Sequence, residues 1–239
     1  MGVTSSRAEG VRGLGPLLQF NVVRVRETFE RFNEICPTPV LWEQAFGELL
    51  GCFTEDSQQH AAFEALDADG DGLVDARELL GAMAVMCDGP LLDRLRLLFE
   101  IYDMEGEGEM CYDEAGMLLK RTAAGLRSMA CIAMVPTPVL DRMTKRIWKV
   151  SRRHWDTRIT PENWESWWTR DAAIRSVLKM FVRGARDEHG LPTSDQLVWF
   201  DYAEVLNDEA KDALAESDLT TQLDKSRTPT PKRSATVVG

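Results

Sequence analysis

The sequence lacks the features by which most enzymes and membrane-spanning proteins are recognised. Its 239 residues contain no apolar run of about eighteen residues and no secretory signal core, so no transmembrane helix is predicted. The 28 basic residues are outnumbered by 39 acidic ones, and the net charge of −11 argues against nucleic acid as a partner. The sequence has no phosphate-binding glycine loop and no nucleophile elbow. The three histidines, His60, His154 and His189, are isolated from one another as well. We therefore predict no catalytic residues and no enzyme.

Cysteine use excludes two further kinds of site. The five cysteines are odd in number and scattered, at residues 36, 52, 87, 111 and 131, so they form neither a disulfide framework nor a CxxC metal site. This pattern favours a reducing compartment. We expect a cytoplasmic protein, partly on the cytoplasmic face of membranes, or alternatively one associated with the cytoskeleton or a cilium.

Acidic residues, in contrast, follow a strict pattern in one twelve-residue segment. Six of its positions offer oxygen atoms: Asp67, Asp69, Asp71, Leu73 through its carbonyl, Asp75 and Glu78. Ca²⁺ takes six to eight oxygens at roughly 2.3 to 2.6 Å, and this spacing supplies them from a sharply turned loop. Gly72 at the sixth position permits the turn, and Val74 at the eighth suits a short pairing strand. The segment therefore predicts an EF-hand calcium loop.

A similar loop follows at a repeat distance of 36 residues, from position 67 to position 103. Around both loops, apolar residues recur every three or four positions, the period of a helix with one buried face. The candidate ligands of this loop, which belongs to the third of the four hands, are Asp103, Glu105, Glu107, Glu109 and Glu114. Longer acids at the third and fifth positions and Cys111 at the ninth predict weaker calcium binding, or a loop that keeps its shape without the ion.

Two more segments align with this repeat but lack ligands. Residues 33–44 place Val40 at the eighth position and contain prolines instead of acids. Residues 152–163 place Ile159 there and carry arginines that would repel a divalent cation. Neither is expected to bind calcium. Since a single hand cannot bury its own apolar face, we predict an all-α fold of four EF-hands in two paired lobes, with N- and C-terminal extensions.

Over about residues 17–183 the chain resembles the recoverin-like neuronal calcium sensors and, more distantly, calcineurin B. The resemblance rests on residues 77–103 between the second and third hands, on the Cys36-Pro37 pair in the first loop, and on residues 159–175. It implies a calcium sensor that exposes an apolar groove and binds a target protein through an amphipathic helix. Candidate groove residues are the methionines together with Trp42, Phe46, Leu49, Leu50 and Phe53, although any one of them can be plain core.

The N-terminus adds a lipidation signal. Residues 1–6, Met-Gly-Val-Thr-Ser-Ser, fit the pattern for myristoylation of Gly2. One myristoyl chain binds membranes only marginally, on the order of 10⁴ M⁻¹, so a second attraction would be required. The alternative to a membrane-associated sensor is a constitutive structural subunit of a cytoskeletal or ciliary assembly.

The expected organisation is an acylated arm (1–16), a first lobe (17–89), a second lobe (90–183) and a C-terminal extension (184–239) that is disordered from about residue 217. Residues 197–206 are apolar enough to fold back onto a lobe. The second lobe is rich in tryptophan, which predicts either a static packed lobe or a partner site: Trp148, Trp155, Trp164, Trp167 and Trp168.

Overall fold

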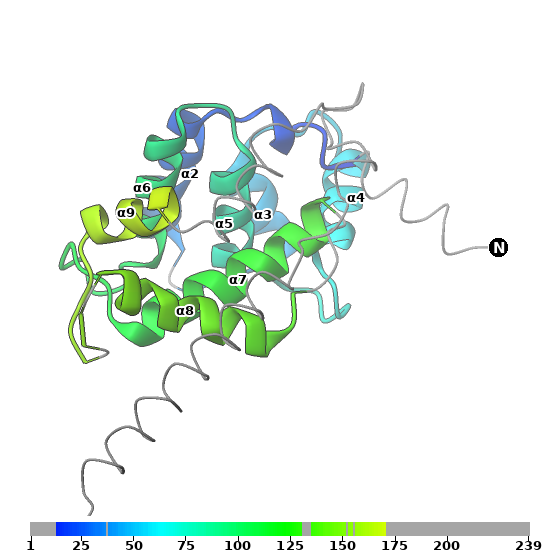
Figure 1. Ribbon diagram of the computed structural model, residues 1–239. Helices are drawn as coiled ribbons and strands as arrows, with labels where there is room; N and C mark the ends of the chain where they lie inside the picture. Colours follow the sequence, from blue (N-terminus) through cyan, green and yellow to red (C-terminus); the bar gives the residue numbers. More distant parts are fainter. Residues whose placement is uncertain (1–12, 37, 131–134, 152, 155, 171–239) are drawn as a thin grey trace, which may run out of the picture. The chain divides into compact units, whose positions relative to one another are not determined.

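The computed structural model describes residues 13–36, 38–130, 135–151, 153–154 and 156–170, all within one compact unit (Figure 1). Within them the chain forms one short 3-10 helix, eight α-helices and one two-stranded sheet. The predicted all-α class is confirmed. In chain order the elements are η1 (Leu17–Gln19), α2 (Val22–Ile35), β1 (Val40–Leu41), α3 (Glu43–Leu50), α4 (Asp56–Leu66), β2 (Val74–Asp75), α5 (Ala76–Met86), α6 (Leu91–Tyr102), α7 (Tyr112–Ala130), α8 (Thr137–Ser151) and α9 (Pro161–Arg170).

The first two hands, α2–α3 and α4–α5, are joined by the antiparallel strands β1 and β2. Leu41 pairs with Val74, and Val40 pairs with Asp75. The expected register was therefore wrong by one residue, because Leu41 rather than Val40 stands opposite the eighth position of the second loop. Leu41 is 1% exposed, whereas Val40 is only half-buried. The first loop thus runs from 34 to 45, and it still lacks acids at its third, fifth and twelfth positions.

The third and fourth hands, α6–α7 and α8–α9, meet through one antiparallel bridge. Met110 and Ile159 exchange both backbone hydrogen bonds, each with an N···O distance of 2.9 Å, and both side chains are fully buried. Each is the eighth residue of its expected loop. The loops of this lobe are therefore held in the register that the spacing predicts.

Residues 13–20 pack into the first lobe rather than forming part of a free arm. Leu14 and Phe20 are fully buried, and Leu17 and Leu18 are nearly so. The backbone of Phe20 accepts a hydrogen bond from Asp88 N at 3.1 Å, and Val22 N donates to Asp88 O at 2.8 Å. The expected boundary of the arm at residue 16 was thus too late, because Leu14, which precedes it, belongs to the core.

The helices α5 and α7 cross closely at two glycines, and Figure 1 shows them side by side. A Cβ on Gly125 of α7 would overlap the Glu78 carbonyl group, with only 2.7 Å to its carbon. A Cβ on Gly81 of α5 would lie 2.7 Å from Thr122 Oγ1 and 2.9 Å from the Tyr102 hydroxyl. Only glycine permits this approach of the two backbones, so the exiting helices of the second and third hands are in direct contact.

Tryptophan fills the core of the second lobe. Trp164, Trp167 and Trp168 lie on α9 with ring centroids 5.2 to 5.4 Å apart, and all three are buried. Trp164 Nε1 donates to the Leu95 carbonyl on α6 at 2.9 Å. Trp148 on α8 is also buried. These four side chains are core, as the static-lobe alternative expects, while Trp155 lies outside the described residues.

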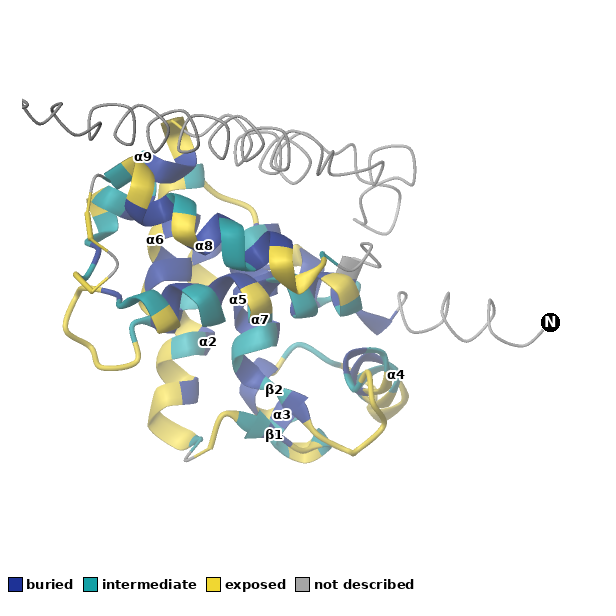
Figure 2. Ribbon diagram, turned by 60° about the horizontal axis from the view of Figure 1, so that its bottom comes forward, coloured by how far each residue is buried: buried dark blue, intermediate teal, exposed yellow. Residues whose placement is uncertain are grey.

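Figure 2 shows buried residues along the helix faces that turn toward one another and exposed residues on the outer faces and loops. No helix among the described residues is long and apolar enough to span a bilayer.

Candidate metal centre

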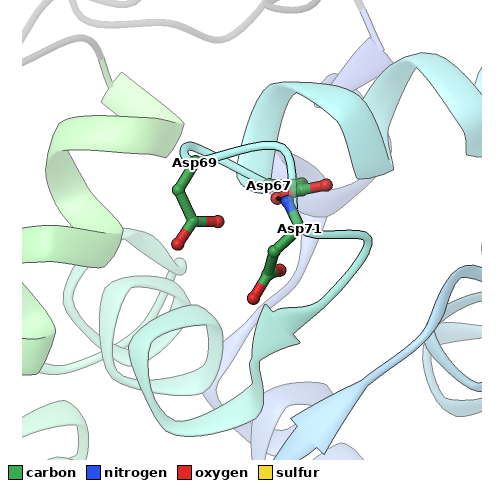
Figure 3. A group of neighbouring side chains, drawn as sticks. All are labelled: Asp67, Asp69 and Asp71. Carbon is green, nitrogen blue, oxygen red and sulfur yellow. Dashed lines mark hydrogen bonds between the residues drawn. The ribbon is translucent and has the colours of Figure 1, made fainter.

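The loop between α4 and β2 gathers three aspartates. Carboxylate oxygens of Asp67, Asp69 and Asp71 lie within 4.8 Å of one another, and Figure 3 shows all three side chains arising from one turn. Asp69 and Asp71 are exposed, and Asp67 is half-buried. These are the first, third and fifth positions of the loop, whose oxygens must converge on one ion.

Backbone N–H groups hold this turn in place. Asp67 Oδ1 accepts from Gly70 N at 2.9 Å, and Asp67 Oδ2 accepts from Gly72 N at 2.9 Å. Asp71 Oδ1 accepts from Leu73 N at 2.9 Å. Gly72 has a φ of 80°, in the left-handed region that favours glycine. The first aspartate therefore shapes the loop in addition to offering its oxygens.

The ninth position has two structural tasks. Asp75 Oδ1 accepts from Arg77 N at 2.9 Å and from Glu78 N at 3.1 Å, which caps the N-terminus of α5. Its other oxygen forms an ion pair with Arg121 of α7. The sequence pattern gave no sign of this arginine, because it lies 46 residues away on another hand. Asp75 thus stands at the edge of the site and connects it to α7.

Glu78, at the twelfth position, is half-buried beside the cluster. Burial raises the pKa of its carboxyl group, and the charge of Asp69 raises that pKa further. No hydrogen bond to this carboxylate is found within the described residues, so nothing offsets its desolvation. A bound cation would do so. The hard oxygen donors of this loop, its carboxylates and the Leu73 carbonyl, fit calcium.

The third loop arranges its acids differently. Asp103 Oδ2 accepts from Gly108 N at 2.7 Å, much as Asp67 does in the second loop. Glu114 is 3% exposed, and its two oxygens accept from Met104 N at 3.2 Å and Cys111 N at 2.7 Å.

Glu105 and Glu107, two further acids of the third loop, pair with Arg158 of the fourth loop. The carboxylate of Glu109 is exposed, and its carbonyl lies 3.5 Å from Arg158 Nη1. The expected ligands are present here, but most already have partners.

Several polar groups of the fourth loop bond to one another. Its one early acid, Asp156, lies 2.6 Å from His154 Nδ1. At the start of α9, Thr160 and Asn163 cap each other through N–H contacts of 3.3 and 3.4 Å. These groups serve the turn and the helix end rather than an ion.

The candidate groove residues of the first lobe are mostly core in this structure. Phe46, Leu49 and Leu50 are at most 3% exposed. Phe46 stacks on Phe53 with ring centroids 5.6 Å apart, while Trp42 is 54% exposed. Gly2 and residues 184–239 lie outside the described residues.

No family model matches the chain. Individual relatives do. A guanylyl cyclase inhibitory protein of Lithobates pipiens is 29% identical over 130 residues, which is 53% of this chain and 63% of that protein, less than two thirds of its length. A guanylyl cyclase-activating protein 2 of Gallus gallus is 25% identical over 191 residues, covering 76% of this chain and 92% of the relative.

A probable calcium-binding protein of Arabidopsis thaliana is 28% identical over 118 residues, covering 46% of this chain and 81% of the relative. These names agree with the expectation of a calcium-binding regulatory protein rather than an enzyme. Both the loop geometry and the names of the relatives therefore indicate calcium as the ion.

Proposed function

This chain is a calcium-binding EF-hand protein that resembles the recoverin-like neuronal calcium sensors, and from that premise we propose that it is a sensor with its principal ion site at Asp67–Glu78. One observation carries the proposal: three aspartate carboxylates converge within 4.8 Å in the first turn of the second loop. Asp67, Asp69, Asp71, the Leu73 carbonyl and Glu78 are the proposed ligands, with Asp75 at the edge. The loop Asp103–Glu114 is a weaker second site.

The proposed output is binding of a target protein. Ion binding in sensor hands moves helices apart and exposes apolar side chains to an amphipathic partner helix. The buried Phe46, Leu49 and Leu50 are the side chains that such a movement would uncover. Two of the relatives are named for action on guanylyl cyclase, which makes an enzyme of that kind the first target to test.

Membrane attachment through Gly2 is the second part of the proposal. The pattern at residues 1–6 supports myristoylation. The protein would then divide between the cytoplasm and the cytoplasmic face of a membrane. The proposed division of the chain has an acylated arm that ends before Gly13, two lobes up to residue 183 and a C-terminal extension.

The test is a calcium titration of the full-length acylated protein, followed by calorimetry and tryptophan fluorescence. A sensor binds calcium with a dissociation constant of roughly 10⁻⁷ to 10⁻⁵ M and changes its emission in the same range. If neither signal responds below millimolar calcium, the sensor proposal fails and a constitutive subunit is favoured.

Membrane association is tested separately by co-sedimentation with liposomes that contain anionic lipid. The acylated protein should pellet with the liposomes, and Gly2→Ala should remain in the supernatant. Equal pelleting of both proteins would contradict the role of Gly2 without affecting the calcium site.

A further inference from the structure

Arg158 of the fourth loop lies among the acids of the third loop. Its guanidinium pairs with Glu105, lies 3.2 Å from Glu107 Oε2 and 4.0 Å from Glu114 Oε2. These glutamates hold the third, fifth and twelfth positions of the third loop, the positions that give carboxylates to the ion in an EF-hand. A guanidinium and a calcium ion would therefore use the same three side chains.

The position of Arg158 follows from the pairing of the two loops. The adjacent residue, Ile159, exchanges two backbone hydrogen bonds with Met110, which fixes the Arg158 backbone beside the third loop. Arg153 Nη1 donates to the Arg158 carbonyl at 3.1 Å, and Trp148 Nε1 donates to the Thr157 carbonyl at 2.9 Å. The fourth loop is thus a braced turn that presents this side chain.

The chemistry of the side chain suits the task. Arginine stays charged at all physiological pH values and offers five N–H donors in a planar fork, so it can contact several carboxylates at once. Glu105 and Glu107 have side chains 56% exposed, whereas the Glu114 side chain is 4% exposed. Exposed pairs contribute little, and the effect of Arg158 depends mainly on compensating the buried Glu114.

We infer that Arg158 is a built-in cation of the third loop, which compensates the charge of Glu105, Glu107 and Glu114 without calcium and lowers the calcium affinity of that loop. The fourth hand then binds no ion itself and instead places the positive charge of Arg158 in the third loop. The inference rests on the proposed calcium function, since it concerns the weaker of the two candidate sites. It makes the second loop the one that responds to calcium first.

The experiment isolates the third loop in the full-length chain with Glu78→Gln, which removes the stronger site. In that background, calorimetry compares Arg158→Gln with the parent. The calcium affinity of the third loop should rise about tenfold, because a competing charge that contacts three ligands is gone. An unchanged affinity overturns the inference.

Two further variants separate this role from a simple packing role. Arg158→Lys keeps the charge but loses the planar fork, so its calcium affinity should lie between those of the parent and of Arg158→Gln. Equal affinity of the lysine and glutamine variants overturns the inference. Arg96→Gln removes the same charge from the same lobe, but Arg96 pairs with Glu165 on α9 at 2.6 Å. It should leave the affinity of the third loop unchanged, and an equal rise would show a general charge effect and overturn the inference.

Thermal unfolding gives a second readout, the change in melting temperature without calcium and with saturating calcium. Without calcium, Arg158→Gln should lower the melting temperature, because three acids lose their cation. With saturating calcium, the ion takes that place and the difference should shrink. A loss of equal size in both conditions means a packing role and overturns the inference. Failure of the proposed function would be seen elsewhere, as absent calcium binding at the second loop when Glu78 is intact.

Discussion

The second and third loops differ in where an arginine stands relative to their acids. At the second loop, Arg121 comes from α7 and pairs with Asp75 at the edge, leaving Asp67, Asp69 and Asp71 to face one another. At the third loop, Arg158 contacts the third, fifth and twelfth positions themselves. Arg121 thus leaves the aspartates of the second loop open to an ion, whereas Arg158 occupies the corresponding place in the third loop.

The closing glutamates show the same difference. Glu114 is buried and accepts two backbone hydrogen bonds, so its charge is compensated within the chain. Glu78 is half-buried without such bonds, and its pKa is raised by burial and then by Asp69. Two loops with similar patterns can therefore differ in their need for a cation, and this difference supports the proposal that the second loop responds to calcium first.

The largest expected effect is that of Glu78→Gln. Replacing the closing carboxylate by an amide removes a bidentate charged ligand, and the affinity of the second loop should fall on the order of 100-fold. Calorimetry of the full-length protein measures it. Glu114→Gln is the matched control and should spare the tighter of the two binding transitions. If Glu114→Gln instead removes the tighter transition, the two loops have been ranked in the wrong order.

Gly125→Ala should separate the two hands where α5 and α7 meet. The added Cβ would overlap the Glu78 carbonyl, so the helices must move apart, and we expect a loss of about 2 kcal/mol in the free energy of unfolding. Denaturant unfolding measures it. Gly116→Ala on the same helix is the control, because its Cβ would meet only Thr144 at 3.8 Å. That change should stabilise the helix by about 0.5 to 1 kcal/mol, and a loss like that of Gly125→Ala would contradict the close crossing.

Tyr102→Phe should have a smaller effect. The Tyr102 hydroxyl is buried and donates to the Arg77 carbonyl at 2.9 Å, joining the residue before the third loop to the residue before Glu78. Its loss removes the tyrosine bond to that carbonyl and should lower stability by about 1 kcal/mol in thermal or denaturant unfolding. Tyr112→Phe, on a half-buried ring, is the control. Equal stability of Tyr102→Phe and wild type would show that the bond contributes nothing.

Arg121→Gln should have the smallest effect and tests the edge position directly. Removing this cation from Asp75 should raise the calcium affinity of the second loop by only about threefold, since the pair is partly exposed and lies outside the aspartate cluster. Calorimetry can compare it with Arg158→Gln at the third loop. If calcium affinity rises more in Arg121→Gln than in Arg158→Gln, the arginine at the edge of the second loop opposes calcium more strongly than the arginine among the acids of the third loop. That result would contradict the comparison.

Helix periodicity and ligand spacing predicted much of the fold. The helices around the second and third loops and the pairing of Met110 with Ile159 lie where the repeat places them. Such features are local, because apolar spacing sets a helix face and an apolar eighth residue sets a pairing point. They need no knowledge of distant contacts.

The first loop shows why register is harder. It has no acids to mark its positions, and Val40 and Leu41 are both apolar, so the pattern alone could not choose between them. The structure chooses Leu41, which is buried opposite Val74. Leu14, buried before the expected start of the first lobe, was missed for a similar reason, since a short segment shows too little periodicity.

The two arginines are the other residues that the pattern did not assign. Arg158 was expected to repel calcium from its own loop, and its reach into the neighbouring loop depends on the bridge at Ile159. Arg158 directly precedes the pairing residue Ile159, and this position in the sequence is a signal that indicates its reach into the third loop. Arg121 offers no such signal, because helix packing alone brings it to Asp75.

The crossing of α5 and α7 has a thermodynamic consequence. Because a backbone-close contact joins α5, which carries Glu78 in its first turn, to a helix of the other lobe, these helices cannot reorient independently. If calcium at the second loop shifts α5, any protein that favours the shifted position of α7 must strengthen calcium binding by the same factor by which calcium strengthens its own. A target of this chain would then set the calcium concentration at which the chain responds.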